Sequence, residues 1–320
     1  MKIIDALKFT QGAVSKKEFI PALTHFRIEG GHIRSFNGTL ALSCPIAIDL
    51  DCIPKAEPLI KAIEQCDETV TLSLTKGRLN VKSGKFKASI PCFTEDDTPH
   101  VYPTGTEMQI DGEALIKGLK VCAPFMADDA SQAWAMGVCL GNQSMYATNN
   151  IAAVEYWVGS TMPHCIIPKP CVSELLRIHD APYKVQVERT SITFHYEGER
   201  WLRTQVVDAD YPDFDTLLNV ESNQKPIDEK IFEGLVKIKP FLDKMAHVYF
   251  FNGLMSSVSN TYEGANYELG DDTMEGIYHH GTLLKLKGVA HTIDFSRYPK
   301  PCPFFGERLR GVIVGMLEAI

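Results

Sequence analysis

Short stretches of alternating apolar and polar residues, joined by glycine-containing turns, recur along the chain and predict antiparallel strands. The clearest case is residues 70–90, where TVTLSL, RLNVK and KFKASI are separated by Lys76-Gly77 and Ser83-Gly84. A period of two with tight glycine turns is typical of a meander of hairpins. Further strands are predicted at 23–30, 32–37, 39–43, 46–50, 134–140, 144–150, 152–158, 247–253, 254–260, 264–270 and 310–318.

Amphipathic stretches with helical spacing lie between these hairpins. The first, at residues 3–17, places Leu7, Phe9 and Val14 on one face, although Gly12 weakens it. Asp111 and Asp228 each precede an apolar-periodic run and suit the N-cap position of a helix. The six predicted helices cover 2–17, 54–66, 111–127, 168–179, 228–242 and the region near 282–290.

A repeat organises these elements. Ile53-Pro54-Lys55 and Ile167-Pro168-Lys169 each open a short helix followed by a meander, and they lie 114 residues apart. A further step of the same length reaches Gly281, where another short helix and strand begin. Repeats of this kind indicate copies of one domain. We therefore expect an α+β protein of three similar domains, 1–105, 106–222 and 223–320, with linkers at 94–106 and 221–226.

Composition is that of an ordinary globular protein, with 45% hydrophobic and 22% charged residues. The chain has no apolar run of membrane-spanning length, and its N-terminus lacks the pattern of a signal peptide. Its nine cysteines include no CxxC pair, which favours free thiols in a reducing cytosol over disulfides or a zinc site. We expect a cytoplasmic protein.

Charge is distributed unevenly. The chain carries a net charge of −8, yet the six predicted helices together carry +6, so the remainder carries −14. Basic residues on a helix are often only a solvated face, but segregation across six helices favours one mildly positive surface. Such a surface suits phosphates without sequence preference. Motifs that read bases, such as a zinc finger or helix-turn-helix, are absent from the sequence.

Catalytic motifs are also missing: the sequence contains neither a P-loop nor GxSxG. His279-His280 with Asp271-Asp272 could suggest a metal site, but adjacent histidines diverge on a strand or helix, so a solvated loop is the stronger interpretation. Cys165 and Cys171 lack a recognisable catalytic partner. We expect no enzyme activity, no metal and no cofactor.

The ordered set of motifs resembles the bacterial DNA polymerase sliding clamp, the β subunit of the replicative polymerase. The resemblance covers nearly the whole chain and is firmest in the middle third. The segments that carry it are IDGEALIKGLKVCAPFMADD, MGVCL, YATNNIAAVE, CIIPKPCVSELLRI and VVDADYPDF, with LNVKSGKFKASI before them and RGVIVGM after them.

The resemblance implies a head-to-tail homodimer that closes a ring of six domains around duplex DNA, with helices lining the hole. Strand 82–90 is the expected dimer edge, with residues 260–269 of the other copy as its partner. Side chains at this edge would be Lys85, Lys87, Ala88 and Ile90. Residues expected to face DNA are Lys8, Lys16, Lys17, Lys55, Lys61, Lys117, Lys120, Lys169, Arg177, Lys230, Lys237, Lys285 and Lys287.

The family also carries an apolar groove in which the replicative polymerase and the clamp loader dock. Matched residue by residue, this groove would use Thr148, Ile151, Ala152, Ala153, Leu217, Leu218, Val312, Val314 and Met316. Two departures stand out. The family commonly has Asp-Gly-His-Arg where this chain has Asn149-Asn150-Ile151-Ala152, and Pro-Met where it has Gly315-Met316. These changes are compatible with a divergent clamp, for example one encoded by a bacteriophage and acting in the infected cell.

Two other functions stay open at this point. One is a structural repeat protein such as a virion component, which would need neither a positive helix face nor a groove. The other is a metal-dependent hydrolase that uses the His279-His280 region.

Overall fold

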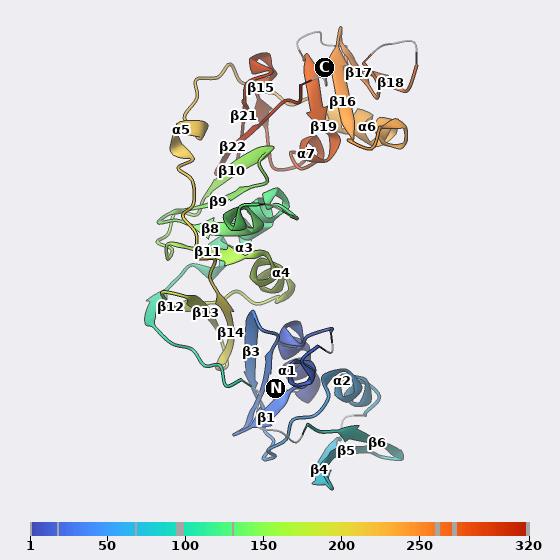
Figure 1. Ribbon diagram of the computed structural model, residues 1–320, viewed down its shortest axis with the longest axis vertical. Helices are drawn as coiled ribbons and strands as arrows, with labels where there is room; N and C mark the ends of the chain where they lie inside the picture. Colours follow the sequence, from blue (N-terminus) through green and yellow to red (C-terminus); the bar gives the residue numbers. More distant parts are fainter. Residues whose placement is uncertain are drawn as a thin grey trace. The chain divides into compact units, whose positions relative to one another are not determined.

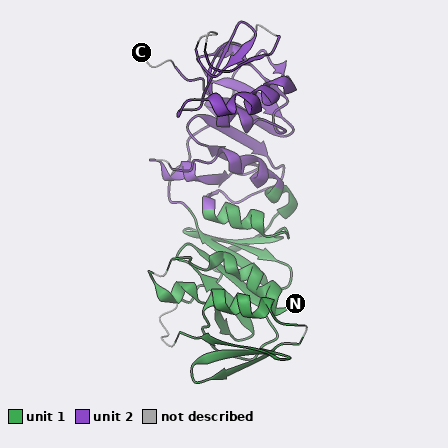
Figure 2. Cartoon of the chain, turned by 90° about the vertical axis from the view of Figure 1, so that its right-hand side faces the viewer, with its two compact units in different colours: residues 1–116, 170–206 green, residues 117–169, 207–320 purple. Residues whose placement is uncertain are grey.

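A computed structural model describes residues 2–17, 19–67, 69–93, 99–129, 131–259, 263–270 and 274–317. The chain forms two compact units. Unit 1 comprises residues 1–116 and 170–206, and unit 2 comprises residues 117–169 and 207–320 (Figure 2). Each unit contains two antiparallel sheets with helices packed against them, so the α+β class is confirmed (Figure 1). Within the described part of the chain, no helix is long and apolar enough to cross a membrane.

The larger sheet of unit 1 has seven strands in the order β1-β2-β3-β14-β13-β12-β7. Its strands are β1 (Arg27–Glu29), β2 (His32–Phe36), β3 (Leu40–Pro45), β14 (Arg200–Gln205), β13 (Ser191–Tyr196), β12 (Lys184–Glu188) and β7 (Thr106–Gln109). The junction between β3 and β14 joins segments about 160 residues apart, with Leu42 opposite Leu202. Both leucines are fully buried, so this junction belongs to the core.

The smaller sheet of unit 1 is the meander β4 (Thr71–Thr75), β5 (Arg78–Ser83) and β6 (Phe86–Pro91). Helix α2 (Ala56–Glu64) packs against it and against α1 (Ile3–Thr10). Leu79, Val81 and Ile90 of the sheet are buried, whereas the other faces of β4 and β6 are exposed. The period-two pattern of the sequence therefore predicted these three strands correctly.

The larger sheet of unit 2 has eight strands in the order β11-β8-β9-β10-β22-β21-β20-β15. Its strands are β11 (Cys165–Pro168), β8 (Gly137–Leu140), β9 (Ser144–Thr148), β10 (Ala152–Trp157), β22 (Leu309–Ile313), β21 (Cys302–Gly306), β20 (Thr292–Ile293) and β15 (Lys225–Pro226). The smaller sheet has the order β18-β17-β16-β19, with β18 (Asn266–Glu268), β17 (Leu254–Ser256), β16 (His247–Phe251) and β19 (Gly276–His279).

The sheets share one plan. A leading triplet of strands follows the first helix of each repeat, and a trailing triplet follows the second. The leading triplets are β1–β3, β8–β10 and β16–β18, after α1, α3 (Gly112–Cys122) and α6 (Glu229–Ile238). The trailing triplets are β4–β6, β12–β14 and β20–β22, after α2, α4 (Lys169–Arg177) and α7 (His280–Leu284). In both larger sheets, the third leading strand pairs with the last trailing strand of the following repeat.

The predicted N-caps are confirmed. The Asp111 carboxylate accepts a hydrogen bond from the backbone N–H of Ala114, and the Asp228 carboxylate accepts one from Lys230. Both bonds satisfy amide groups that a helix start leaves unpaired. Helix α1 differs, because Lys2 at its N-cap position makes no such bond.

Several predicted elements were wrong in extent. Residues 46–50 form no strand: the Ile46 N–H donates to the Gly31 carbonyl, and the segment then lines a groove. Helix α1 ends at Thr10, with only a short 3-10 turn beyond it, and Val14 is half-buried. The linker predicted at 94–106 lies outside the described residues over 94–98, and Thr106 already belongs to β7. The second linker contains β15.

Candidate functional site

Three predicted groove residues lie side by side across unit 2's larger sheet. Ala153 on β10 stands opposite Thr148 on β9 and opposite Val312 on β22. Residues that lie directly opposite each other on antiparallel strands have their side chains on the same face of the sheet. All three are buried, with exposed fractions of 4% or less. Sheet pairing thus brings together residues that are up to 164 positions apart in the sequence.

A short helix covers this row. Helix α5 (Asp215–Leu218) contacts β22, and the buried residues Ala153, Phe214, Leu218 and Val312 form one apolar cluster. Leu217 packs against the cluster while remaining partly accessible. The predicted groove residues Ala153, Leu218 and Val312 therefore pack together, but Leu218 and Val312 are buried and lie beneath the accessible surface.

A single arginine ties α5 to the sheet. On β22, Arg310 donates from its guanidinium to the Asp215 carboxylate at 2.9 Å and to the Asn219 side-chain oxygen at 2.5 Å. It also pairs with Glu155 on β10. These carboxylates raise the pKa of Arg310 and hold it charged, against the opposing effect of burial. The position of α5 is thus set by a half-buried polar cluster at one side of the apolar row.

The remaining predicted groove residues lie differently. Ala152 precedes Ala153 on the same strand and therefore points to the opposite face of the sheet. Val314 donates its backbone N–H to the Ile151 carbonyl at 2.8 Å, and Met316 donates to the Ile277 carbonyl at 2.7 Å. The side chains of Ile151, Val314 and Met316 are partly or largely accessible. They extend the apolar face beyond the buried row.

Aromatic residues beside this face were missed by the sequence analysis. Tyr211 contacts Trp134, Tyr146 and Phe214, with ring centroids 5.1–6.3 Å apart. A cavity of about 210 Å³ lies beside Tyr146, Tyr211 and Phe214, and it is lined also by Cys139, His164, Pro212, Asp213 and Asp215. Burial and the nearby Glu155 carboxylate raise the pKa of Tyr146 to about 12, so its hydroxyl stays protonated and donates to Glu155. The DYPDF segment was the available signal, because it places two aromatics around a turn.

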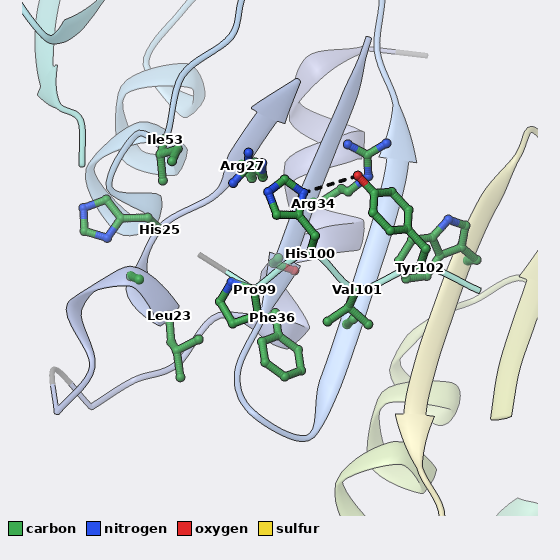
Figure 3. Close-up of a pocket in the computed structure, with 14 residues that line it drawn as sticks. Leu23, His25, Arg27, Arg34, Phe36, Ile53, Pro99, His100, Val101 and Tyr102 are labelled. Atoms are coloured by element: carbon green, nitrogen blue, oxygen red, sulfur yellow. Dashed lines mark hydrogen bonds between the residues drawn. The ribbon is translucent and has the colours of Figure 1, made fainter. Parts of the chain in front are cut away.

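A second cavity lies in unit 1, where residues 99–102 cross the sheet (Figure 3). Arg34 lies over the Tyr102 ring at 5.3 Å, and the His100 ring nitrogen is 3.4 Å from the Tyr102 hydroxyl. The Glu29 carboxylate forms ion pairs with the guanidinium groups of Arg27 at 2.9 Å and Arg34 at 3.9 Å. The hydrogen bond from Arg27 and the two positive charges lower the pKa of Glu29. The enclosed space is about 30 Å³, room for about one water molecule. Internal charge pairing accounts for this cluster.

Most of the cations predicted to face DNA are exposed. The exposed residues on helices are Lys8, Lys61, Lys117, Lys120, Arg177, Lys230 and Lys237. Lys16, Lys17 and Lys287 are also exposed, but they lie beyond the ends of α1 and α7, contrary to the predicted helix bounds. The half-buried ones are Lys55, Lys169 and Lys285. Lys117 and Lys120 share one face of α3, since residues three apart are neighbours on a helix. Whether any of them contacts DNA remains a prediction.

Arg177 has a structural task within unit 1. Its guanidinium donates to the backbone carbonyls of Lys8 and Phe9 at 2.9 and 2.8 Å, near the end of α1, and pairs with the buried Glu174. Carbonyls near a helix C-terminus lack intrahelical partners, so Arg177 satisfies groups that would otherwise be unpaired. A Cβ at Gly12 would lie 1.7 Å from the Glu174 carboxylate, which explains a glycine there.

Two further predicted cations interact within unit 2. Lys169 forms an ion pair with Asp128, whose pKa it lowers. Lys285 lies 6.0 Å from the centre of the Phe125 ring, and burial lowers its pKa. These contacts leave both residues less available to a nucleic acid than the exposed pair on α3.

At the predicted dimer edge, Lys85 and Lys87 are exposed and Ala88 is half-buried. Ile90 is only 3% exposed, so its side chain belongs to the core beneath β6. Residues 260–262 of the expected partner region lie outside the described residues, but Asn266–Glu268 form β18, an edge strand.

The two adjacent histidines have separate roles. The His279 ring nitrogen accepts a hydrogen bond from the Thr282 backbone and caps α7, while the buried His280 ring lies 2.9 Å from the Leu235 carbonyl. Asp271 and Asp272 lie outside the described residues. Among the described residues, no cluster of three or more His, Cys, Asp or Glu side chains has the geometry to hold a metal.

Comparisons with known proteins define the fold. Protein-family profiles gave no match, and neither did curated protein sequences. Solved structures did. A *Pseudomonas aeruginosa* DNA polymerase sliding clamp with ligand is 15% identical with a TM-score of 0.84, covering 98% of this chain and 97% of that one. A *Helicobacter pylori* β clamp bound to DNA ligase peptide is 15% identical with a TM-score of 0.80 and the same coverage. A *Thermotoga maritima* DNA polymerase III β subunit is 16% identical with a TM-score of 0.82, covering 99% and 97%. The chain therefore has the fold of the bacterial β sliding clamps.

Proposed function

We propose that this chain is a DNA sliding clamp: a non-enzymatic processivity factor that encircles duplex DNA and tethers the replicative polymerase. Three domains, 1–105, 106–222 and 223–320, would each contribute to a ring formed by two copies. The polymerase and a clamp loader would bind the apolar face beside α5. The protein would act in the cytoplasm of a bacterium or of a phage-infected cell. The observation that carries the proposal is the unfinished state of the two smaller sheets.

Both larger sheets join a leading triplet to a trailing triplet of the following repeat. The two remaining triplets, β16–β18 and β4–β6, are not joined to such a partner within the described part of the chain. By the same rule, β18 of one copy would pair with β6 of another. That contact is heterologous, because it joins two different surfaces of the chain. Heterologous contacts produce a closed ring when the rotation from one copy to the next brings the last copy back to the first. A head-to-tail homodimer would then complete both smaller sheets.

Charge favours this pairing. β6 and its turn carry Lys87 and Lys85, both exposed, whereas Glu268 on β18 and the nearby Glu263 are exposed acids. Opposite charges across paired strands contribute roughly 0.2–1 kcal/mol each. Helix α6, which packs under β18, and the segment after it expose Val236, Phe241 and Met245 at 60–62%. A second copy at this edge would have apolar surface to cover.

Sliding requires weak contacts. The exposed cations on α1, α3 and α6 would meet phosphates without sequence preference, while the net charge of −8 discourages tight binding elsewhere. Processivity would then come from topological linkage. The partner site would use the accessible apolar residues Ile151, Leu217, Val314 and Met316, which gain roughly 25 cal/mol per Å² when covered.

Retention on DNA tests the ring. We expect the full chain to stay on nicked circular DNA through gel filtration and to be released when that DNA is linearised. Replacing Lys117 and Lys120 by Glu should weaken retention on the circle by at least about fivefold, since each lost phosphate contact lowers the affinity for DNA. The matched control, Lys244→Glu with Lys300→Glu, makes the same charge change on exposed residues outside the helices. Equal retention on linear and circular DNA would exclude the clamp function.

The partner site has its own test. The probe is a fluorescent copy of the DNA ligase peptide bound by the *Helicobacter pylori* clamp. We expect Leu217→Ala with Met316→Ala to weaken binding by about tenfold, because two accessible apolar contacts are lost. Both positions are preferable to Val312, whose 1% exposure makes truncation a core defect. Thr216→Ala on the same helix is the control. Unchanged binding in the double variant would place the partner site elsewhere.

A further inference from the structure

The trailing triplets differ at their outer edge. In the seven-stranded sheet, β12 is covered by β7, which ends shortly before α3 begins. In the eight-stranded sheet, β20 is covered by β15, which ends shortly before α6 begins. The equivalent strand β4 pairs only with β5 among the described residues. In the described part of the chain, one of three equivalent positions therefore has no covering strand.

The backbone of β4 presents free groups at this edge. Thr75 pairs with Arg78 across Lys76-Gly77, and both turn residues have positive φ, of 51° and 68°. This is the two-residue hairpin turn whose flanking pair exchanges both hydrogen bonds. Along an antiparallel strand, the backbone N–H and C=O groups of successive residues point alternately toward the paired strand and away from it. The N–H and C=O groups of Leu72 and Leu74 therefore point away from β5, toward the uncovered side.

An apolar groove of about 1170 Å³ opens beside the same edge. Its lining includes Leu72 of β4, Ile3 and Ile4 of α1, and Ile46 and Ile48 of the segment after β3. Leu74 is 44% exposed and lines an adjoining pocket. Natural edge strands are normally protected by lysine, proline or a bulge. The sequence of β4, TLSLT, contains neither lysine nor proline.

We propose that β4 accepts an extended segment of a partner protein, which adds as a strand in the position that β7 and β15 occupy on β12 and β20. The partner segment would have apolar side chains at alternate positions, one set entering the groove beside Leu72. The charges at the rim, Lys2 and Lys8 against Asp49, Glu64 and Asp67, nearly balance. An uncharged segment is therefore preferred. Main-chain bonds would give affinity, and the groove would give specificity.

A synthetic peptide tests this directly on the full chain. The probe alternates valine with threonine over five residues, with a serine at each end and a fluorophore. Two versions are N-methylated, one at the valines and one at the threonines, so that only one keeps the N–H groups facing β4. We expect saturable binding with a Kd of about 10–100 μM and a difference of at least about tenfold between the two methylated versions. Equal affinities, or no saturable binding below about 1 mM, would overturn strand addition.

Variants locate the site. Leu74→Lys puts a charge on the face that meets the partner and should weaken binding of the probe by at least about fivefold. Ser73→Lys adds the same charge to the opposite face of β4 and should change affinity by less than about twofold. Circular dichroism checks that both variants are folded. If Leu74→Lys instead abolishes assemblies larger than a dimer seen by light scattering, the occupant is a second copy, and the partner assignment is wrong. The test uses no DNA, so its failure leaves the clamp function standing.

Discussion

The two edges of the sheet β4-β5-β6 are built differently, although they belong to the same meander. The β6 edge carries Lys87, has Lys85 in its turn and ends at Pro91, while the β4 edge exposes Leu74 and half-buries Leu72. Charge and proline at an edge discourage unspecific pairing and leave room for a charge-matched partner. An apolar, unprotected edge accepts any strand that fits. In the proposed ring, β6 would be selective for β18 of a second copy, whereas β4 would stay open to a different molecule.

The covered equivalents sharpen this contrast. β12 is enclosed between β13 and β7, and its Val185 is fully buried. On β4, four of the five residues are exposed. The same fold position is therefore more buried in one repeat than in another, and among the described residues β4 has no neighbour strand like the one that covers β12.

The largest effect should come from breaking the β6 edge. Ser83 and Phe86 flank the two-residue turn Gly84-Lys85, so the backbone N–H of Lys87 points away from β5. Lys87→Pro removes that donor without removing a bond inside the sheet. We expect the dimer dissociation constant to rise by at least about tenfold, since one ladder bond is lost and the edge is sterically blocked. Sedimentation of the variant measures this.

A charge exchange controls for damage by proline. Lys87→Glu should weaken the dimer by about two- to fivefold, and adding Glu268→Lys should restore it. Rescue would identify β18 as the partner of β6. A dimer that is insensitive to both changes would mean that the copies associate through another surface. Leu74→Lys should leave the dimer unchanged, and a loss there would remove the distinction between the two edges.

Much of this fold was predictable from local pattern. The strands of β4–β6 and the Asp-capped starts of α3 and α6 follow from alternation, glycine turns and capping residues within a few positions. The short strands β7, β15 and β20 were not, because strands of two to four residues exist only through their neighbours. Residues 46–50 show the converse: an apolar alternating run faces a groove and forms no strand.

The candidate site was predictable only in part. The resemblance selected Thr148, Ala153 and Val312, and sheet register places them in one row. Burial could not be anticipated, because the covering by α5 depends on Arg310, a residue on another strand. The aromatic group around Tyr211 draws on three separate segments, so no spacing in the sequence marks it.

The smallest expected effect comes from adding a strand that covers β4 within the same chain. Replacing the residues ahead of Ile3 by a copy of residues 105–111 adds a β7-like strand and an aspartate at the N-cap of α1, where Lys2 makes no capping bond. The cap contributes about 1 kcal/mol, so the melting temperature should rise by a few degrees, about 2–4 °C. Lys2→Asp alone should give the cap without the strand. If β4 is an acceptor edge, only the longer variant should lose the valine–threonine probe, because its own strand now occupies the position. Equal probe binding by both variants would show that the groove, and not the β4 backbone, holds the peptide, and β4 and β6 would then no longer differ as acceptors of a strand.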